Sequence, residues 1–149
     1  MVFPTTRERV PRNTAEEFNQ RIADMTHARV EAMFVDPTKI PGRLEQLDRE
    51  WDIERTIEAN AATLALAGTL LGIFYSSYWL ILPLLVTGFL LQHALQGWCP
   101  PVPILRRLGF RTAYEIEQER HALKALRGDY RLPETSGSGA RAVIEAAER

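Results

Sequence analysis

The chain has 149 residues, a quarter of which are charged, and its formal net charge is -1. Residues 1–58 carry 9 basic and 12 acidic side chains, and residues 98–149 carry 9 and 7, so neither end is strongly basic and a nucleic acid is not an expected partner. The single cysteine, Cys99, excludes an intrachain disulfide and any cysteine-cluster metal site. The sequence has no phosphate-binding loop, paired carboxylate site or metal-ligand spacing, so we expect neither an enzyme nor a cofactor.

The first 51 residues predict a polar, helical arm. The first 20 contain no apolar core, so no signal peptide is expected and the arm is expected to stay in the cytosol. Thr14 and Glu17 have the spacing of a capping box, which predicts a helix from there to about Phe34. Prolines and a glycine between residues 36 and 42 end this helix, and a second one is expected to follow them.

The second arm helix has an amphipathic pattern. Leu44, Leu47, Trp51 and Ile57 recur at three- to six-residue steps, with charged side chains between them. The pattern allows one long helix that continues into the uncharged segment described next. Two interpretations stay open: a collar that docks a partner or lies on the membrane surface, and a solvated helix that only leads into the membrane.

Residues 59–97 contain no charged side chain. A Tyr-Ser-Ser-Tyr-Trp sequence at residues 75–79 interrupts them, and the apolar stretches on either side are about 17 and 19 residues long. As helices they would span roughly 25–29 Å, close to the roughly 30 Å hydrocarbon core of a bilayer. A soluble domain of this size would not bury two helices that are apolar on every face. The sequence therefore predicts an all-α membrane protein with spans at about residues 58–75 and 79–97, inside a module of residues 52–111.

The short interruption allows only a tight turn, so the spans are expected to form an antiparallel hairpin with both termini on one side. Arginines flank the hairpin and the turn is uncharged, so the positive-inside rule places both termini in the cytosol. Amphipathic aromatic rings suit the two membrane interfaces, and arginines after the second span suit lipid phosphates. The residues expected at the interfaces are Trp51, Tyr75, Tyr78, Trp79, Trp98, Arg106, Arg107 and Arg111.

The prolines at positions 100, 101 and 103 are expected to stop the second span. Residues 104–111 then suit a short interfacial segment whose arginines reach headgroups. Residues 112–149 form the third predicted segment. Thr112 and Glu115 are a second capping-box signal, which predicts a helix to about Arg127 with Gly128 as its C-cap. Residues 132–140 read as a flexible linker, and residues 141–149 as one or two helical turns.

Several of these features resemble one family. They are Glu-Arg-Thr-Ile at residues 54–57, a first span rich in small residues, a short turn, and Gly-Trp-Cys-Pro at residues 97–100 followed by Ile-Leu at 104–105 and Leu-Gly at 108–109. Over residues 52–110 the chain resembles the YgaP-like transmembrane domain, a bacterial inner-membrane domain of unknown function that occurs alone or fused to rhodanese. The resemblance implies a two-helix inner-membrane module and supplies no activity. A second proline follows Cys-Pro here, where the family usually has an ordinary residue.

Small residues line one face of the first span. Gly68 and Gly72 form a GxxxG pattern, which Ala61 and Ala65 extend. Small side chains let helix backbones approach closely, and such packing drives association where lipid supplies no hydrophobic force. Two interpretations stay open: dimerisation through this face, and packing on the second span of the same hairpin at a site such as Gly88.

Two side chains near the cytosolic end of the second span are candidates for chemistry. Cys99 is a candidate persulfide or redox thiol, which the rhodanese fusions suggest, although a helix C-terminus disfavours thiolate. The alternative is a small interfacial side chain. His93, beside Gln92 and Gln96, is a candidate haem ligand or proton relay, and the alternative is a polar residue that reaches the interface. The spans contain no Asp, Glu, Lys or Arg, which argues against ion-coupled transport.

The arms contain more ordered helix than a bare anchor needs. We therefore expect the two amphipathic arm helices to pack on each other or on a partner, through the apolar residues Leu44, Leu47, Ile116, Leu123 and Leu126. The sequence predicts a non-catalytic scaffold or accessory subunit, which binds the lipid bilayer and forms a homo-oligomer or joins other membrane-complex subunits. The alternative is a sulfur- or redox-linked membrane protein that works through Cys99.

Overall fold

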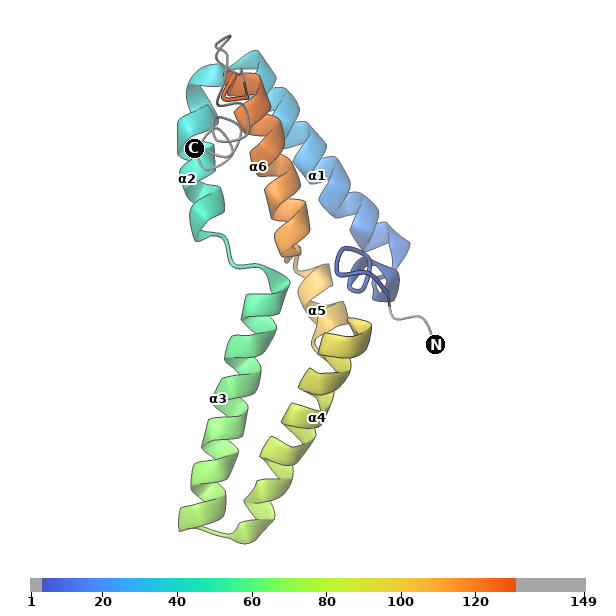
Figure 1. The fold of residues 1–149 in the computed structure, drawn as a ribbon, viewed down its shortest axis with the longest axis vertical. Helices are drawn as coiled ribbons and strands as arrows, with labels where there is room; N and C mark the ends of the chain where they lie inside the picture. The colour runs from blue at the N-terminus through green and yellow to red at the C-terminus, as the bar shows by residue number, and fades with distance from the viewer. Residues whose placement is uncertain (1–3, 131–149) are drawn as a thin grey trace, which may run out of the picture. The chain divides into compact units, whose positions relative to one another are not determined.

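The computed structural model describes residues 4–130, and every regular element in that part of the chain is a helix (Figure 1). The all-α prediction is therefore confirmed for these residues. The predicted linker at residues 132–140 and the predicted turns at 141–149 lie outside them. The elements are η1 (Pro11–Asn13), α1 (Glu16–Val35), η2 (Pro37–Lys39), α2 (Ile40–Arg49), α3 (Ile53–Phe74), η3 (Ser77–Leu80), α4 (Ile81–Gln96), α5 (Val102–Arg107) and α6 (Ala113–Arg127).

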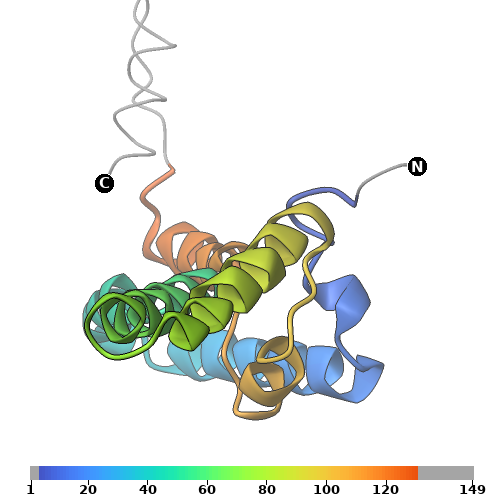
Figure 2. The same cartoon turned by 90° about the horizontal axis from the view of Figure 1, so that it is seen from below.

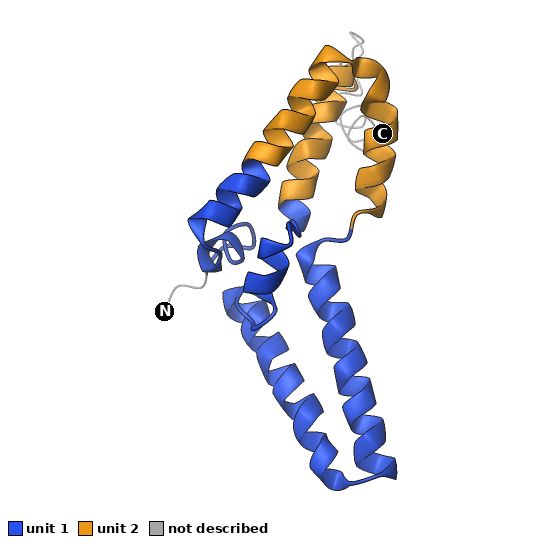
Figure 3. Cartoon of the chain, turned by 180° about the vertical axis from the view of Figure 1, so that it is seen from behind, with its two compact units in different colours: residues 1–23, 51–114 blue, residues 24–50, 115–149 orange. Residues whose placement is uncertain are grey.

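The chain divides into two compact units, and each is built from two separate stretches of sequence (Figure 3). Unit 1 contains residues 1–23 and 51–114, and unit 2 contains residues 24–50 and 115–149. This division differs from the three consecutive segments that the sequence predicts. Each unit brings an early stretch of the chain together with a much later one.

In unit 1, α3 and α4 lie side by side and are joined by η3, as Figures 1 and 2 show. The segments Pro37–Phe74, which ends in α3, and Ser77–Gln96, which ends in α4, are long and apolar enough to cross a membrane by length and composition. Their large apolar side chains are mostly exposed on the outer faces; Leu66 on α3 is 62% exposed and Leu84 on α4 is 71% exposed. Such surfaces are the compositional signature of helices that face lipid.

The first span does not continue α2 as one long helix. The chain leaves the helical conformation at Glu50, which has φ -69° and ψ 128°. Asp52 then caps α3, because its carboxylate accepts a hydrogen bond of 2.6 Å from the backbone N–H of Arg55. This bond satisfies one of the donors that a helix N-terminus leaves unpaired. The amphipathic pattern is therefore divided: Leu44 and Leu47 belong to unit 2, and Ile57 belongs to unit 1.

The apolar core of unit 1 lies at the end of the hairpin remote from the turn. It contains Val10 from the N-terminal segment, Ile53 and Ile57 from α3, Cys99, and Val102 from α5. The hydrogen bond from the Ile53 N–H to the Arg111 carbonyl, at 2.8 Å, ties the start of α3 to the segment after α5. At this end, α3 and α4 therefore pack against the N-terminal segment and α5.

Unit 2 is built from the second half of α1, α2 and α6. Its core contains Ile40, Leu44 and Leu47 on α2 and Ile116 and Leu123 on α6. Helix α6 ends where the sequence predicts, because Gly128 follows it with φ 89° and donates its N–H to the Lys124 carbonyl at 3.1 Å.

The start of the first arm helix differs slightly from the prediction. α1 begins at Glu16, and the hydroxyl of Thr14 donates a hydrogen bond of 2.9 Å to the carbonyl of Val10, one turn earlier. Thr14 therefore ties the turn before α1 together, and it does not occupy the first position before the helix, as an N-cap residue would.

Candidate functional site

Cys99 and His93, the two candidates for chemistry, lie next to each other in unit 1. Their Sγ and Nδ1 atoms are 3.6 Å apart, and the two residues are 2% and 5% exposed. The turn at Gly97 brings them together: this residue ends α4 in the left-handed conformation, with φ 77° and ψ 10°, and its N–H donates to the carbonyl of His93 at 2.8 Å. The helix therefore ends at Gln96, before the prolines that we expected to stop it.

The surroundings of the pair favour a neutral thiol. Burial raises the pKa of Cys99 above its ordinary value of 9.0, and a hydrogen bond from the backbone N–H of Val102 lowers it by less. A neutral thiol donates a hydrogen bond to Nδ1 when the imidazole proton sits on Nε2. The Nε2 atom of His93 is buried and has no hydrogen-bond partner among the described residues. The pair is therefore a thiol beside a base, and not a preformed thiolate.

An apolar groove opens beside Cys99. It lies between α3 and α4 at the end of the hairpin remote from the turn and has a volume of about 280 Å³. Cys99, Pro100 and Pro101, which follow α4, are part of its lining. The side chains along it are Ile57, Ala61, Leu64, Val86, Phe89 and Leu90. Apart from Asn60 the lining is apolar, which gives the groove the chemistry of a hydrocarbon site, and the nucleophilic residue Cys99 is part of that lining.

The N-terminal segment contacts the end of α4, close to the pair. Arg9 donates a hydrogen bond of 3.2 Å to the carbonyl of Ala94 and lies 3.9 Å from the carboxylate of Glu54. Asn13 donates to the carbonyl of Gln96 at 2.8 Å. These bonds satisfy carbonyls that the end of α4 leaves unpaired. Sequence reasoning missed this role of the N-terminal segment because the carbonyls that Arg9 and Asn13 bind lie 85 and 83 residues away.

Two of the arginines expected at the membrane interface are buried instead. Arg106 is 1% exposed, and its guanidinium donates to Asn19 Oδ1 at 2.8 Å and to the Phe110 carbonyl at 3.2 Å. Arg111 is 2% exposed. The prediction that these two side chains reach outward to headgroups is wrong, because both are buried inside unit 1. Arg107 is exposed and stacks over the Phe18 ring, 5.5 Å from its centroid.

The two glycines of the first span face the segment that follows it: Gly68 faces α4, and Gly72 faces Leu80 at the end of η3. A Cβ atom at Gly68 would come within 2.7 Å of Pro83 Cδ, and one at Gly72 would collide with the Leu80 side chain. Of the two interpretations left open, the structure therefore supports packing within the hairpin. Gly88 is not the contact point, because nothing lies within 4 Å of its Cβ position. Ala61 and Ala65 are partly buried on the same helix.

The aromatic residues lie near the two ends of the hairpin. Tyr75 and Tyr78 are each 82% exposed beside the turn, with Trp79 next to them. Trp51 lies just before α3, where the Arg55 guanidinium stacks over its ring at 4.3 Å from the centroid, and Trp98 is partly buried after α4. Their contact with a membrane interface stays a prediction.

Four of the five leucine and isoleucine residues proposed to dock a partner are buried in the core of unit 2. Leu44, Leu47, Ile116 and Leu123 are at most 8% exposed and pack on one another, so they are not available to another protein. These four residues join α2 to α6 within unit 2, rather than presenting an exposed surface to a partner. Leu126 is 38% exposed.

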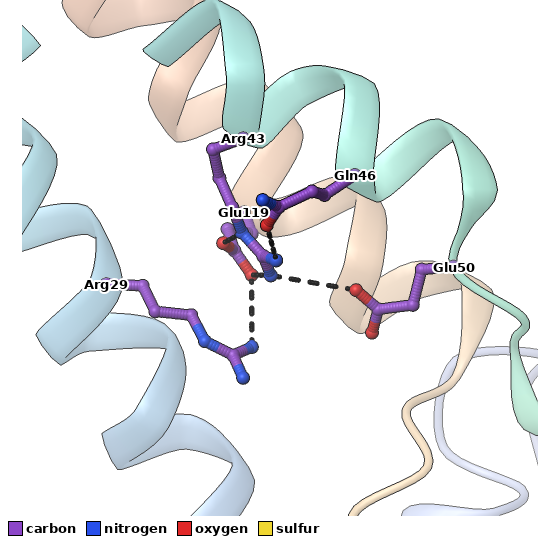
Figure 4. A network of polar contacts seen from close by, with 5 residues as sticks. All are labelled: Arg29, Arg43, Gln46, Glu50 and Glu119. Atoms are coloured by element: carbon purple, nitrogen blue, oxygen red, sulfur yellow. Dashed lines mark hydrogen bonds and ion pairs between the residues drawn. The ribbon is translucent and has the colours of Figure 1, made fainter. Parts of the chain in front are cut away.

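A buried carboxylate ties the three helices of unit 2 together (Figure 4). The side chain of Glu119 on α6 is 0% exposed, and Arg43 on α2 donates two hydrogen bonds to it, at 2.7 and 3.1 Å. Arg29 on α1 lies 3.8 Å from the same carboxylate. Arg43 also contacts Gln46 at 3.0 Å and Glu50 at 3.6 Å. Sequence reasoning did not single out Arg29, Arg43 or Glu119 and therefore missed the network.

No family model matches the chain, and neither the curated proteins nor the solved structures contain a match. Among residues 4–130, no group of three or more His, Cys, Asp or Glu side chains is placed to hold a metal ion.

Proposed function

We propose that the protein is an integral membrane protein whose α3 and α4 form a hairpin in a bacterial inner membrane and carry a folded cytosolic unit. The outer faces of these helices carry the proposal. They are apolar, mostly exposed and free of charge from residue 59 to residue 97. Exposing this apolar surface to water would cost about 25 cal/mol of free energy per Å². Contact with lipid removes that cost. The resemblance to the YgaP-like domain agrees with this placement and stays a prediction.

Cysteine labelling tests the topology. In a Cys99→Ser background, new cysteines at the exposed positions Glu8 and Ala125 are expected to be protected from an impermeant maleimide added to intact cells, and one at Ser77 is expected to react. The reason is the arginine bias beside an uncharged turn. All three sites are expected to react after the membrane is permeabilised, which controls for burial. Reaction of Glu8→Cys or Ala125→Cys from outside would refute the cytosolic placement of the termini.

The role that we propose for unit 2 is that of a scaffold or accessory subunit in a homo-oligomer or a larger membrane assembly. Its buried leucines are used internally, so a partner must use exposed apolar residues. Phe34 and Val35 at the end of α1 are 69% and 79% exposed, and Leu126 lies near the end of α6. Figures 1 and 3 show that these two helices end at the same end of unit 2. Exposed aromatic and aliphatic side chains of this kind are typical anchors of protein interfaces.

Gentle extraction tests this role. The complete protein, solubilised in mild detergent, is expected to run as an assembly with itself or with a second membrane protein identified by mass spectrometry. The double substitution Phe34→Ser, Val35→Ser is expected to release it, and Glu31→Ser, Ala32→Ser on exposed positions of the same helix is the matched control. A monodisperse single chain from wild-type membranes would refute the scaffold role.

A second candidate function uses Cys99 as a persulfide or redox thiol, and the 3.6 Å contact with His93 is the observation that favours it. Cys99→Ser separates the two functions. Retained assembly with lost sulfur transfer would favour the thiol function. Unchanged sulfur metabolism with an intact assembly would leave the scaffold function alone.

A further inference from the structure

The Cys99–His93 pair and the groove beside it form a site that scaffolding does not use. It combines a thiol, a base 3.6 Å away and an apolar groove of about 280 Å³ whose wall includes the cysteine itself. That volume is close to the roughly 300 Å³ at which ligand pockets begin. The lining is almost wholly hydrocarbon, with Asn60 as an exception, so it suits a chain without charge or hydrogen-bonding groups.

We propose that Cys99 is a site of S-acylation, with a long-chain acyl group held as a thioester on Sγ and its hydrocarbon chain lying in the groove between α3 and α4. The inference rests on the proposed membrane placement of these helices. A cysteine at the end of a membrane span is a common position for such a thioester. The contact with the imidazole and the groove that Cys99 helps to line distinguish this residue from an unassisted surface cysteine.

The chemistry is a transfer between two thioesters. The donor is a long-chain acyl thioester of the coenzyme A type. The Nδ1 atom of His93 accepts the Cys99 proton as Sγ bonds to the carbonyl carbon of the donor. The bond between that carbon and the donor sulfur breaks, and the imidazolium returns the proton to the departing thiolate. No oxidant or reductant takes part. The thiol is neutral before reaction, so a base beside it matters more than it would for a preformed thiolate.

The groove predicts a preference for chain length. A long chain is covered by the groove when it is attached to Cys99, whereas an acetyl group leaves the groove empty. Ala61 lies on the groove wall, and a larger side chain there would fill part of the space. Ala67 is exposed on the same helix and does not line the groove, so the same substitution there is a matched control.

The test uses the complete protein in phosphatidylcholine and phosphatidylglycerol nanodiscs, incubated with palmitoyl-CoA or with acetyl-CoA, and measured by intact-mass spectrometry. We expect one palmitoyl group per chain, removable by hydroxylamine and absent from Cys99→Ser. His93→Gln is expected to slow the reaction by about 100-fold, the size of effect typical of a general base. Ala61→Phe is expected to slow palmitoylation at least about 10-fold without slowing acetylation, and Ala67→Phe is expected to change neither.

Several results would overturn the proposal: no adduct on the wild type, equal rates for the two donors, an equal rate for Ser77→Cys in the Cys99→Ser background, or no difference between the two alanine variants. Thermal unfolding of each variant separates lost chemistry from lost folding. Failure of acylation in a protein that still partitions into membranes would refute this site alone, whereas failure to partition would refute the proposed function.

Discussion

The buried carboxylate of Glu119 gives the sharpest prediction for unit 2. Arg43→Met keeps the length of the side chain but removes the two hydrogen bonds of 2.7 and 3.1 Å that Arg43 donates to this carboxylate. Glu119 is 0% exposed, so water cannot replace the lost partner, and Arg29 at 3.8 Å compensates only in part. Removing one member of a buried ion pair costs about 3–5 kcal/mol of folding stability. Because Arg29 remains near the carboxylate, we expect a loss of about 3 kcal/mol, at the lower end of this range.

The assay is hydrogen exchange of α6 in the complete protein in nanodiscs. A loss of about 3 kcal/mol corresponds to roughly 100-fold faster exchange of amides that exchange only when unit 2 opens. Arg49→Met is the matched control, because Arg49 lies on the same helix and its pair with Glu45 at 2.6 Å is exposed on both sides, at 78% and 66%. Exposed pairs contribute under about 1 kcal/mol, so exchange should rise about fivefold at most.

A double substitution separates the lost charge pair from lost packing. Arg43→Met with Glu119→Leu removes the stranded carboxylate and is expected to recover much of the stability that Arg43→Met alone loses. Equal exchange in Arg43→Met and Arg49→Met would refute the reasoning. So would a double variant that is less stable than the single one, because the carboxylate would then not be the source of the loss.

Three further predictions concern unit 1. Gly68→Leu is expected to separate α3 from α4 and to make these helices sensitive to protease without changing the oligomeric state. Gly88→Leu, at an open position, is the control and is expected to be tolerated. Equal proteolysis of the two variants would contradict the packing of Gly68 against Pro83. Gly97→Ala is expected to destabilise unit 1 by more than about 1–2 kcal/mol, which is the cost of the left-handed conformation alone, because the added Cβ would also collide with the Arg9 backbone. Gly42→Ala in α2, at an open position, is the control and is expected to stabilise the protein slightly. Unchanged proteolysis of the N-terminal segment in Gly97→Ala would argue against the contact with Arg9. The rate at which a membrane-permeant maleimide alkylates Cys99 is expected to keep rising above pH 9.0, because burial raises the pKa of the thiol and only the thiolate reacts. A rate that reaches a plateau below pH 9.0 in both the wild type and His93→Gln would be inconsistent with a buried thiol.

The sequence supports the helical class and the apolar pair because both depend on local pattern. The uncharged run predicts two helices of the observed kind, and Gly128 predicts the end of α6. Two other local signals were available and missed. Asp52 before Glu54 and Arg55 has N-cap chemistry that separates α2 from α3, and Gly97 is a glycine of the kind that ends helices in the left-handed conformation.

The remaining features depend on contacts between distant residues, which a single sequence does not carry. Arg43 and Glu119 are 76 positions apart, and Arg106 and Asn19 are 87 apart. An arginine after an apolar span has the same local pattern whether it reaches a headgroup or a buried amide. The small-residue face of α3 likewise has the same pattern for a partner in the same chain and for one in a second copy. The meeting of Cys99 and His93 depends on the turn at Gly97, so only the two residues, and not the pair, were candidates.

Because each unit combines an early and a late stretch of the chain, the order of translation determines when each core can fold. Leu44 and Leu47 leave the ribosome before either span, but the residues that cover them, Ile116 and Leu123, are made only after both spans. Val10 likewise waits for Val102 before its core can close. Each nascent chain therefore presents uncovered apolar side chains on its arm while the spans are being inserted. Unit 2 cannot mature before α6, the last helix, emerges, so a chain that stops before residue 123 should be recognised by chaperones and proteases as unfinished even with both spans in place.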